Sequence, residues 1–203
     1  MLLFKSVENF ISIEQTFWFS DFVQDTFKIK DSFEIFKSYA FSFVISSITG
    51  VLLSGLLVSL LGGYRSLRSL IMMSITSLLA CSIGIINGYS STFPQFTKLN
   101  CIFYVLYNIS SNFVILLSLL EINYKMKGYA VGFFIFSLQI LAFLPAPIVY
   151  AELKLYFNSS KKAMKILMDY SAIGVLCMVW SLIYRLIKIF KYLRKKPLIK
   201  QNK

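Results

Sequence analysis

The chain has 203 residues, of which 57% are hydrophobic and only 15% are charged. A soluble globular domain carries about 25% charged residues, so this composition excludes an ordinary soluble domain and predicts an integral membrane protein. The net charge of +12 does not indicate nucleic acid, because most lysines and arginines lie in short connections and after the last apolar segment, where membrane proteins place them.

The first apolar segment, residues 2–23, is predicted to be a partial or atypical membrane span. Lys5, Glu8 and Glu14 interrupt it, and each ionised side chain near the bilayer midplane would cost about 2.5 to 3.5 kcal/mol. An interfacial helix is the alternative, because the aromatic residues 17–19 precede two aspartates in a pattern typical of an aromatic belt at a membrane surface.

The longest uncharged stretch is predicted to be the first clear crossing. A polar outer connection, residues 24–38, precedes it, and residues 39–61 then run for 23 residues without a charge, enough for the roughly 20 helical residues that cross a hydrocarbon core. Small side chains recur at every fourth position, which allows a neighbouring helix to approach closely. These positions are Ser42, Ser46, Gly50 and Ser54.

A basic turn is predicted directly after this crossing. Gly62 and Gly63 free the backbone to reverse direction, and Arg65 and Arg68 place positive charge just beyond them. We expect this turn to be cytoplasmic.

The second crossing is predicted over residues 70–89. It also has a small-residue face, formed by Ser77, Ala80, Gly84 and Gly88. A short loop, residues 90–100, is expected to follow, with Pro94 and a single lysine, Lys98.

The third crossing is predicted over residues 101–120, and polar side chains follow helical spacing along one side of it. They are Tyr104, Tyr107, Asn108, Ser111, Asn112 and Ser118. Polar groups are costly against lipid, so this side must face other helices or a water-filled path. Hydrogen bonds between helices and a lining for a cavity are equally good interpretations.

The fourth crossing is predicted over residues 128–150, with Gln139 as its one strongly polar residue near the middle. Three positions seven residues apart are expected to share a face: Gly132, Gln139 and Ala146. Pro145 and Pro147 remove two backbone donors, so the helix should bend or end there. Such a point can serve a gate or simply terminate the helix.

The last third of the chain is expected to contain a loop with four lysines (residues 151–168), a fifth crossing (residues 170–189) and a basic tail. The predicted fold is therefore an all-α, polytopic transmembrane bundle with five clear spans and one partial span. It forms a single membrane domain, residues 1–203, with residues 1–38 as partial span and outer loop, 39–190 as the five-span bundle and 191–203 as the tail.

The distribution of positive charge predicts the orientation of the spans. The basic tail, the arginine turn and the Lys125/Lys127 loop are expected on the cytoplasmic side, which leaves the Lys98 loop outside. The lysine-rich loop 151–168 disagrees with this rule because it must then also lie outside. Its glycosylation sequon, Asn158-Ser159-Ser160, is consistent with that side.

Three segments occur in an order found in a known family. They are residues 17–22, residues 50–68, and residues 121–150 with Gly128-Tyr129-Ala130 and Leu144-Pro145-Ala146-Pro147. The pattern resembles the carboxy-terminal half of the major facilitator superfamily, most closely its spinster-like or organic-anion-transporter-like members. The segments are similar to the end of the seventh helix, the eighth helix with its cytoplasmic turn, and the eleventh helix with its preceding loop. The chain departs from the pattern in having no acid in residues 62–68, and Ala151 where similar members have glycine.

This resemblance implies transport of small organic or amphipathic solutes by alternating access between two six-helix halves. The candidate substrate-path residues are Tyr104, Tyr107, Asn108, Ser111, Asn112 and Gln139, and the candidate coupling acid is Glu14. Because one half is present, we expect a truncated gene model, a fragment, or a half that pairs with another chain. The alternative is a non-transporting membrane assembly subunit or a degenerate transporter.

Enzymatic function is not expected. The chain has no histidine, and Cys81, Cys101 and Cys177 have no paired or metal-like spacing. Paired intramembrane aspartates and a glycine-framed serine are also absent from the sequence. We therefore expect no catalytic residues, no metal and no cofactor, and a bilayer as the constant partner.

Overall fold

The computed structural model describes residues 2–63, 66–120, 122–177, 179–180, 183–184 and 187, with the side chains of residues 2–4, 67, 70, 112–120 and 124 left out. Within these ranges the secondary structure is helical without strands, which confirms the all-α prediction. The elements are α1 (Leu2–Phe27), α2 (Ser32–Tyr39), η1 (Ala40–Ile45), α3 (Ser46–Leu60), α4 (Leu67–Gly88), α5 (Phe93–Leu120), η2 (Tyr124–Met126), α6 (Lys127–Leu138), η3 (Gln139–Phe143), α7 (Ala146–Phe157) and α8 (Ser160–Asp169).

Three helical stretches of the described chain are long and apolar enough to cross a membrane. They are Ser32–Leu60, Ile71–Gly88 and Lys127–Phe157. The first, second and fourth predicted crossings coincide with them to within one residue or lie inside them, so these membrane-length helices are confirmed. Helix α5 covers the predicted third crossing without interruption, and its passage through a membrane stays a prediction. So does the fifth crossing, residues 170–189, of which residues 171–177 are helical and the remainder lies largely outside the described residues.

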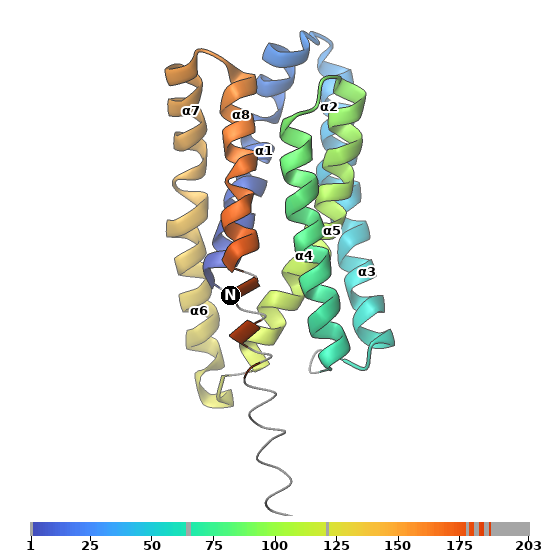
Figure 1. Ribbon diagram of the computed structural model, residues 1–203, viewed down its shortest axis with the longest axis vertical. Helices are drawn as coiled ribbons and strands as arrows, with labels where there is room; N and C mark the ends of the chain where they lie inside the picture. The colour runs from blue at the N-terminus through green and yellow to red at the C-terminus, as the bar shows by residue number, and fades with distance from the viewer. Residues whose placement is uncertain are drawn as a thin grey trace, which may run out of the picture.

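The helices run up and down along one common axis (Figure 1). Helices α3, α4 and α5 pack together on one side, while α6, η3 and α7 form a long helical column on the other. Helix α1 lies between these groups and contacts α5, η3, α7 and α8. The Gly62-Gly63 turn and the Lys125 turn lie at the same end of the bundle, as the charge pattern predicts.

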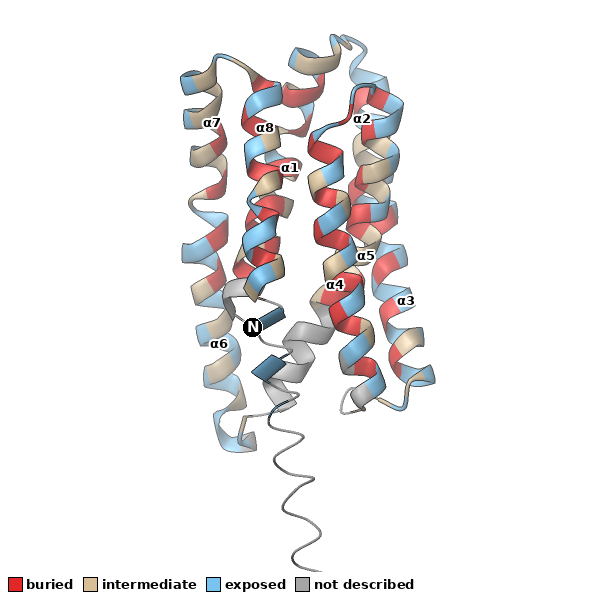
Figure 2. Ribbon diagram, viewed as in Figure 1, coloured by how far each residue is buried: buried red, intermediate tan, exposed pale blue. Residues whose placement is uncertain are grey.

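The small-residue faces of α3 and α4 are confirmed by their burial. Ser42 of η1 and Ser46, Gly50 and Ser54 of α3 are all buried, and both elements pack against α5. Ser77, Ala80, Gly84 and Gly88 on α4 are buried as well. Figure 2 shows buried positions on the inward sides of the helices and exposed positions along their outer sides. The two stripes therefore set how closely the helices approach.

An aromatic core fills the centre of the bundle beside α1. Phe19 is 1% exposed and meets Phe43 and Phe96 with ring centroids 5.4 and 5.9 Å apart. Trp18 stacks on Tyr150 of α7 at 5.1 Å. The predicted aromatic belt is therefore wrong for these two residues, since their rings hold helices together. Phe17 is exposed.

Two predicted connections are helical in the structure. Within residues 24–38, α1 continues to Phe27 and α2 begins at Ser32, where the Asp31 carboxylate accepts a hydrogen bond from the Phe33 N–H at 2.9 Å. Within residues 90–100, α5 begins at Phe93 with Pro94 in its first turn, a position that proline tolerates. In both cases the helices extend past the uncharged segments from which the crossings were predicted.

The predicted loop 151–168 is wrong. Helix α7 continues to Phe157, Asn158 in the left-handed conformation ends it, and α8 begins after the Ser159 cap. Helix α8 is amphipathic, since it buries Ala163, Met164, Leu167 and Met168 while Lys161 and Lys162 are exposed. Lys161 and Lys162 therefore lie on the outer face of a helix and not in a loop.

The predicted shared face of the fourth crossing is also wrong. Gly132 and Gln139 are exposed, whereas Ala146 is fully buried. The cause is the π-helical stretch η3, in which the Leu144 N–H bonds the Gln139 carbonyl at 3.0 Å, five residues back. A π-turn adds one residue and rotates the following helix by about 100°. The irregularity itself agrees with the bend predicted at Pro145 and Pro147.

Candidate functional site

Helix α1 carries all the charged side chains that are buried in the described part of the bundle, namely Lys5, Glu8 and Glu14. Six of its polar side chains are buried: Lys5, Ser6, Glu8, Asn9, Glu14 and Gln15. With 26 residues α1 is about 39 Å long, which is enough to cross a membrane. Its charged residues nevertheless exclude it from the helical stretches that are apolar enough to count as membrane spans. Its burial does not support an interfacial helix. Ionisable residues inside a membrane bundle mark functional sites by default.

The polar face of α1 pairs with α5 near the start of α1. Lys5 and Glu8, 1% and 3% exposed, are joined by an ion pair of 3.3 Å between Nζ and Oε2. The Ser110 hydroxyl donates to Glu8 Oε1 at 3.1 Å. The Tyr107 hydroxyl donates to Asn9 Oδ1, and Lys5 Nζ lies 4.2 Å from the centre of the Tyr107 ring. We call these five residues the α1–α5 polar cluster.

The predicted substrate-path residues of α5 are used in contacts between helices. Tyr104 is buried, and its hydroxyl donates to the Ser12 carbonyl at 2.9 Å. The Asn108 side chain donates to Ser47 Oγ of α3 at 3.1 Å and to the Tyr104 carbonyl at 2.8 Å. Together with Tyr107, these residues meet α1 and α3 side by side, which supports the hydrogen-bonding interpretation of the polar stripe.

Of the remaining predicted path residues, the described Ser111 and Gln139 form no hydrogen bond with this group. Ser111 is half-buried on α5, and Gln139 is exposed at the start of η3. The Asn112 side chain lies outside the described residues, as does that of Ser118 in the predicted polar stripe. Among the described path residues, the structure brings together Tyr104, Tyr107 and Asn108.

The predicted cytoplasmic turn has the geometry that its glycines allow. Gly62 and Gly63 have φ values of +86° and +89°, which side-chain-bearing residues rarely adopt. The Ser66 hydroxyl caps α4 by accepting from the Ser69 N–H at 3.0 Å. Arg68 is exposed on the first turn of α4, and Arg65 lies outside the described residues.

The break in the α6–α7 column lies against α1. Trp18 Nε1 donates to the Pro147 carbonyl at 3.1 Å, and α1 contacts both η3 and α7. Ala142 and Ala146, on either side of Pro145, are fully buried. The irregular segment is therefore a packed contact with α1.

Glu14 is a buried acid at the middle of α1. It is 1% exposed, and neither of its carboxyl oxygens has a hydrogen-bond partner among the described residues. Glu14, the candidate coupling acid, shares the helix with a second buried acid, Glu8. The two acids differ in that Glu8 is paired and Glu14 is not.

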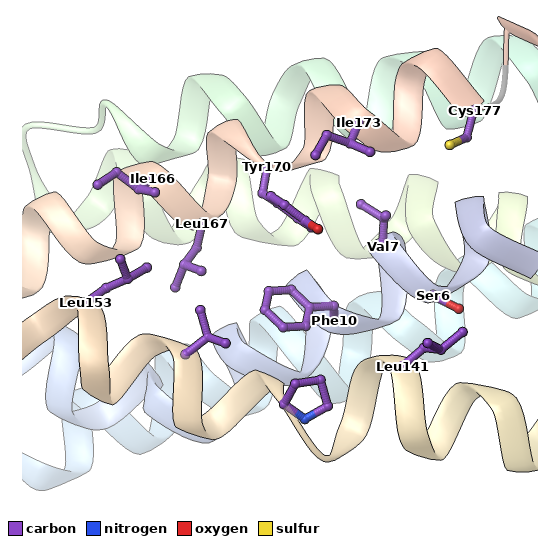
Figure 3. Close-up of a pocket in the computed structure, with 12 residues that line it drawn as sticks. Ser6, Val7, Phe10, Leu141, Leu153, Ile166, Leu167, Tyr170, Ile173 and Cys177 are labelled. Atoms are coloured by element: carbon purple, nitrogen blue, oxygen red, sulfur yellow. The ribbon is translucent and has the colours of Figure 1, made fainter.

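An apolar cleft opens on the side of α1 opposite the α1–α5 polar cluster. It lies between the α6–α7 column and the helical segment that begins with α8. Its volume is about 580 Å³. Figure 3 shows the rings of Phe10 and Tyr170 projecting into it from opposite sides, and their centroids are 5.7 Å apart. Leu141 lies on the α6–α7 wall, and Ser6 supplies a hydroxyl at one end. The cleft can hold an apolar chain or ring system.

A network of charges closes the upper end of the bundle in Figure 1. Lys154 Nζ of α7 lies 2.7 Å from Asp21 Oδ2 and 2.5 Å from Asp25 Oδ2 of α1. The Ser160 hydroxyl of α8 donates to Asp25 Oδ2 at 2.8 Å. Hydrogen bonds from Lys154 and Ser160 lower the pKa of the Asp25 carboxyl below its ordinary value of 3.8. These contacts, which we call the lysine latch, tie together α1, α7 and α8.

We expect Lys154→Met to loosen the lysine latch. The change removes two partly exposed ion pairs, so the loss of unfolding free energy should be about 1 kcal/mol in thermal unfolding of the purified protein. Lys161→Met, an exposed lysine on α8, is the control and should have little effect. Because the Asp25 pKa is lowered in the folded state, the latch stabilises the protein above pH 3.8 and loses this contribution as pH falls further. Equal melting of both variants would contradict this assignment.

Sequence reasoning missed the cleft and the lysine latch. The latch could have been found from Asp21 and Asp25, which are four residues apart and share one face of a helix continued past residue 23. The cleft could not, because its walls come from distant segments with ordinary apolar side chains.

Comparisons with known proteins give no relative for this chain. No family model, no curated protein and no solved structure matches it. The resemblance to the major facilitator superfamily therefore has no support from these comparisons and stays a prediction. No group of three or more histidine, cysteine, aspartate or glutamate side chains that could hold a metal occurs in the described part of the chain.

Proposed function

We propose that the protein binds and moves an amphipathic, lipid-like organic solute within the membrane. The observation that carries this proposal is the apolar cleft beside α1. Its volume of about 580 Å³ lies in the range of small-molecule sites, which is about 300 to 1,000 Å³. Its lining is almost wholly apolar, so it suits a hydrocarbon chain or ring system better than a sugar or an ion.

The broken helix along one wall of the cleft supports movement of the solute as well as binding. Leu141 and Pro145 line the cleft and belong to the interrupted part of the α6–α7 column. Transporters commonly form their substrate sites at discontinuous membrane helices, because such helices can change shape at the break. Alternating access with a second half, as in the major facilitator superfamily, is one form that this movement can take, and the proposal does not depend on that family.

A non-transporting assembly subunit is the second candidate function. The observation that favours it is the use of Tyr104, Tyr107 and Asn108 in contacts between helices, since these residues would otherwise be the natural polar contacts for a solute. In such a subunit the cleft would hold structural lipid. Binding without transport distinguishes this function from the first.

We expect Ile173→Trp to block solute binding. Ile173 lines the cleft, and an indole placed there would occupy the space of the solute. Overpacking of this kind costs about 1 to 3 kcal/mol, which corresponds to a loss of affinity of about 5-fold to 150-fold. The measurement is binding of a fluorescent long-chain fatty acid to protein in phosphatidylcholine nanodiscs, followed by flux of the same probe into proteoliposomes.

The matched control is Leu176→Trp, which places the same indole on an exposed position of the same segment outside the cleft. It should bind the probe like the unchanged protein. Binding that is equally strong in both variants would overturn the cleft as the site. Binding without flux would instead favour the assembly subunit.

A further inference from the structure

Glu14 lies on the side of α1 that faces the break in the α6–α7 column. Phe10 and Trp18, four residues before and after it, share its face of the helix. Phe10 lines the cleft together with Leu141 and Pro145, and Trp18 bonds to the Pro147 carbonyl. Glu14 is therefore placed between two contacts with the broken column.

Its surroundings suit a neutral carboxyl group and exclude a stable carboxylate. Glu14 is 1% exposed, and neither oxygen has a hydrogen-bond partner in the described part of the chain. A buried charge without a partner costs several kcal/mol, whereas a neutral carboxyl can donate its O–H to a carbonyl. On the facing column, Pro145 and Pro147 lack the backbone N–H groups that in a regular helix would bond to carbonyls of the preceding turn.

We propose that Glu14 is a proton-binding site, and that loss of its proton releases α1 from the broken α6–α7 column and opens the cleft. With the proton bound, the packing of α1 against Ala142 and Ala146 is undisturbed. When the proton leaves to solvent, the carboxylate must gain water, and water reaches it only if α1 and the column separate. The use of this step in transport rests on the proposed function, but the opening itself does not.

Other titratable groups near this contact are held differently. On α1, Glu8 pairs with Lys5, and Asp21 pairs with Lys154 of α7. On α5, the Tyr104 hydroxyl bonds to Ser12 and the Tyr107 hydroxyl to Asn9. The remaining groups on packed elements are Asp25 of α1 (which also pairs with Lys154), Glu34, Lys37 and Tyr39 of α2, Lys98 and Cys101 of α5, Lys127 and Tyr129 of α6, Tyr150, Glu152 and Tyr156 of α7, Lys161, Lys162, Lys165 and Asp169 of α8, and Tyr170 at the end of α8.

Trp18 provides the measurement, because it reports on the contact directly. The chain has two tryptophans, so Trp180→Phe leaves Trp18 as the only one. In phosphatidylcholine nanodiscs without added solute, we expect its emission to shift to the red and its quenching by acrylamide to increase as pH rises between about 5 and about 10, the range in which buried glutamates titrate. In the same background, Glu14→Gln should abolish this transition and Glu14→Asp should keep it.

Two controls assign the transition to Glu14. Glu152→Gln changes an exposed acid on α7 and should leave the transition in place. Tyr150→Phe should also leave it in place, which excludes ionisation of the ring that stacks on Trp18. If Glu14→Gln does not fold, the pH at which the Glu14→Asp variant makes the transition must differ from that of the unchanged residue.

A transition that persists unchanged in Glu14→Gln, or that is absent from the Trp180→Phe parent, would overturn the proton site. Neither result tests whether the cleft binds a solute, because solute binding is measured separately with the Ile173→Trp variant. Conversely, a Glu14-dependent transition in a protein that binds no fatty acid would keep the proton site and overturn the proposed solute.

Discussion

Gly50→Leu will prevent α3 from packing against α5 and will destabilise the protein severely. A Cβ atom at Gly50 would lie 2.6 Å from the Val105 carbonyl oxygen and 2.8 Å from Asn108 Cβ. The first of these is a backbone atom, which cannot move aside as a flexible side chain can. We expect a loss at or above the upper end of the range for overpacked cores, about 1 to 3 kcal/mol, measured as thermal or denaturant unfolding in detergent.

Gly55→Leu on the same helix is the matched control. A Cβ there meets nothing within 4 Å among the described residues, and the position is exposed. Leucine has better helix propensity than glycine by several tenths of a kcal/mol, so this variant should be as stable as the original chain or slightly more stable. Similar losses at both positions would show that helix composition, not the α3–α5 contact, sets the stability.

The Gly50 contact illustrates what could be predicted from the sequence. The spacing of small side chains by three or four residues in the α3 and α4 segments predicted their buried faces correctly, because helical geometry alone places such residues on one side. The Gly62-Gly63 turn was predictable for the same kind of local reason. Which helix packs on each face was not predictable, because partners come from distant parts of the chain.

The failures of prediction have two physical causes. Crossings were bounded where charges begin, yet helices continue into polar residues whenever caps and amphipathic packing support them, as Asp31 and Ser159 do here. The second cause is the π-turn at Gln139. It breaks the regular period from which the shared face of Gly132 and Ala146 was predicted, and no residue pattern marks a π-turn as clearly as proline marks a bend.

Helix α1 shows why a membrane site is hard to predict from composition. Lys5, Glu8 and Glu14 counted against a span, since each charge is costly in lipid. In the structure these residues are surrounded by protein. Lys5 and Glu8 form an ion pair, and the Ser110 hydroxyl donates a hydrogen bond to the second carboxyl oxygen of Glu8. The penalty is therefore reduced where the bundle supplies a partner, as it does for Lys5 and Glu8, and it remains for a carboxylate at Glu14, which is unpaired among the described residues.

The second large effect follows from that arrangement and concerns Lys5 and Glu8. Lys5→Met leaves the Glu8 carboxylate buried without its cation, and removal of one partner from a buried pair costs about 3 to 5 kcal/mol. The double variant Lys5→Met/Glu8→Gln removes both charges while keeping the Glu8 shape and an amide for Ser110. We expect it to recover most of the stability lost in Lys5→Met, as measured by thermal unfolding.

A double-mutant cycle separates this coupling from simple loss of packing. Partners in direct contact show an interaction free energy of about 0.5 to 3 kcal/mol, whereas independent sites add within about 0.5 kcal/mol. If the effects of Lys5→Met and Glu8→Gln simply add, the two charges do not stabilise each other. A positive coupling would instead mean that Lys5 and Glu8 are tolerated inside the bundle as a pair. Glu14 lies on the same helix without such a partner in the described part of the chain, so the cost of its charge must be avoided in another way, which for a carboxyl group is retention of its proton.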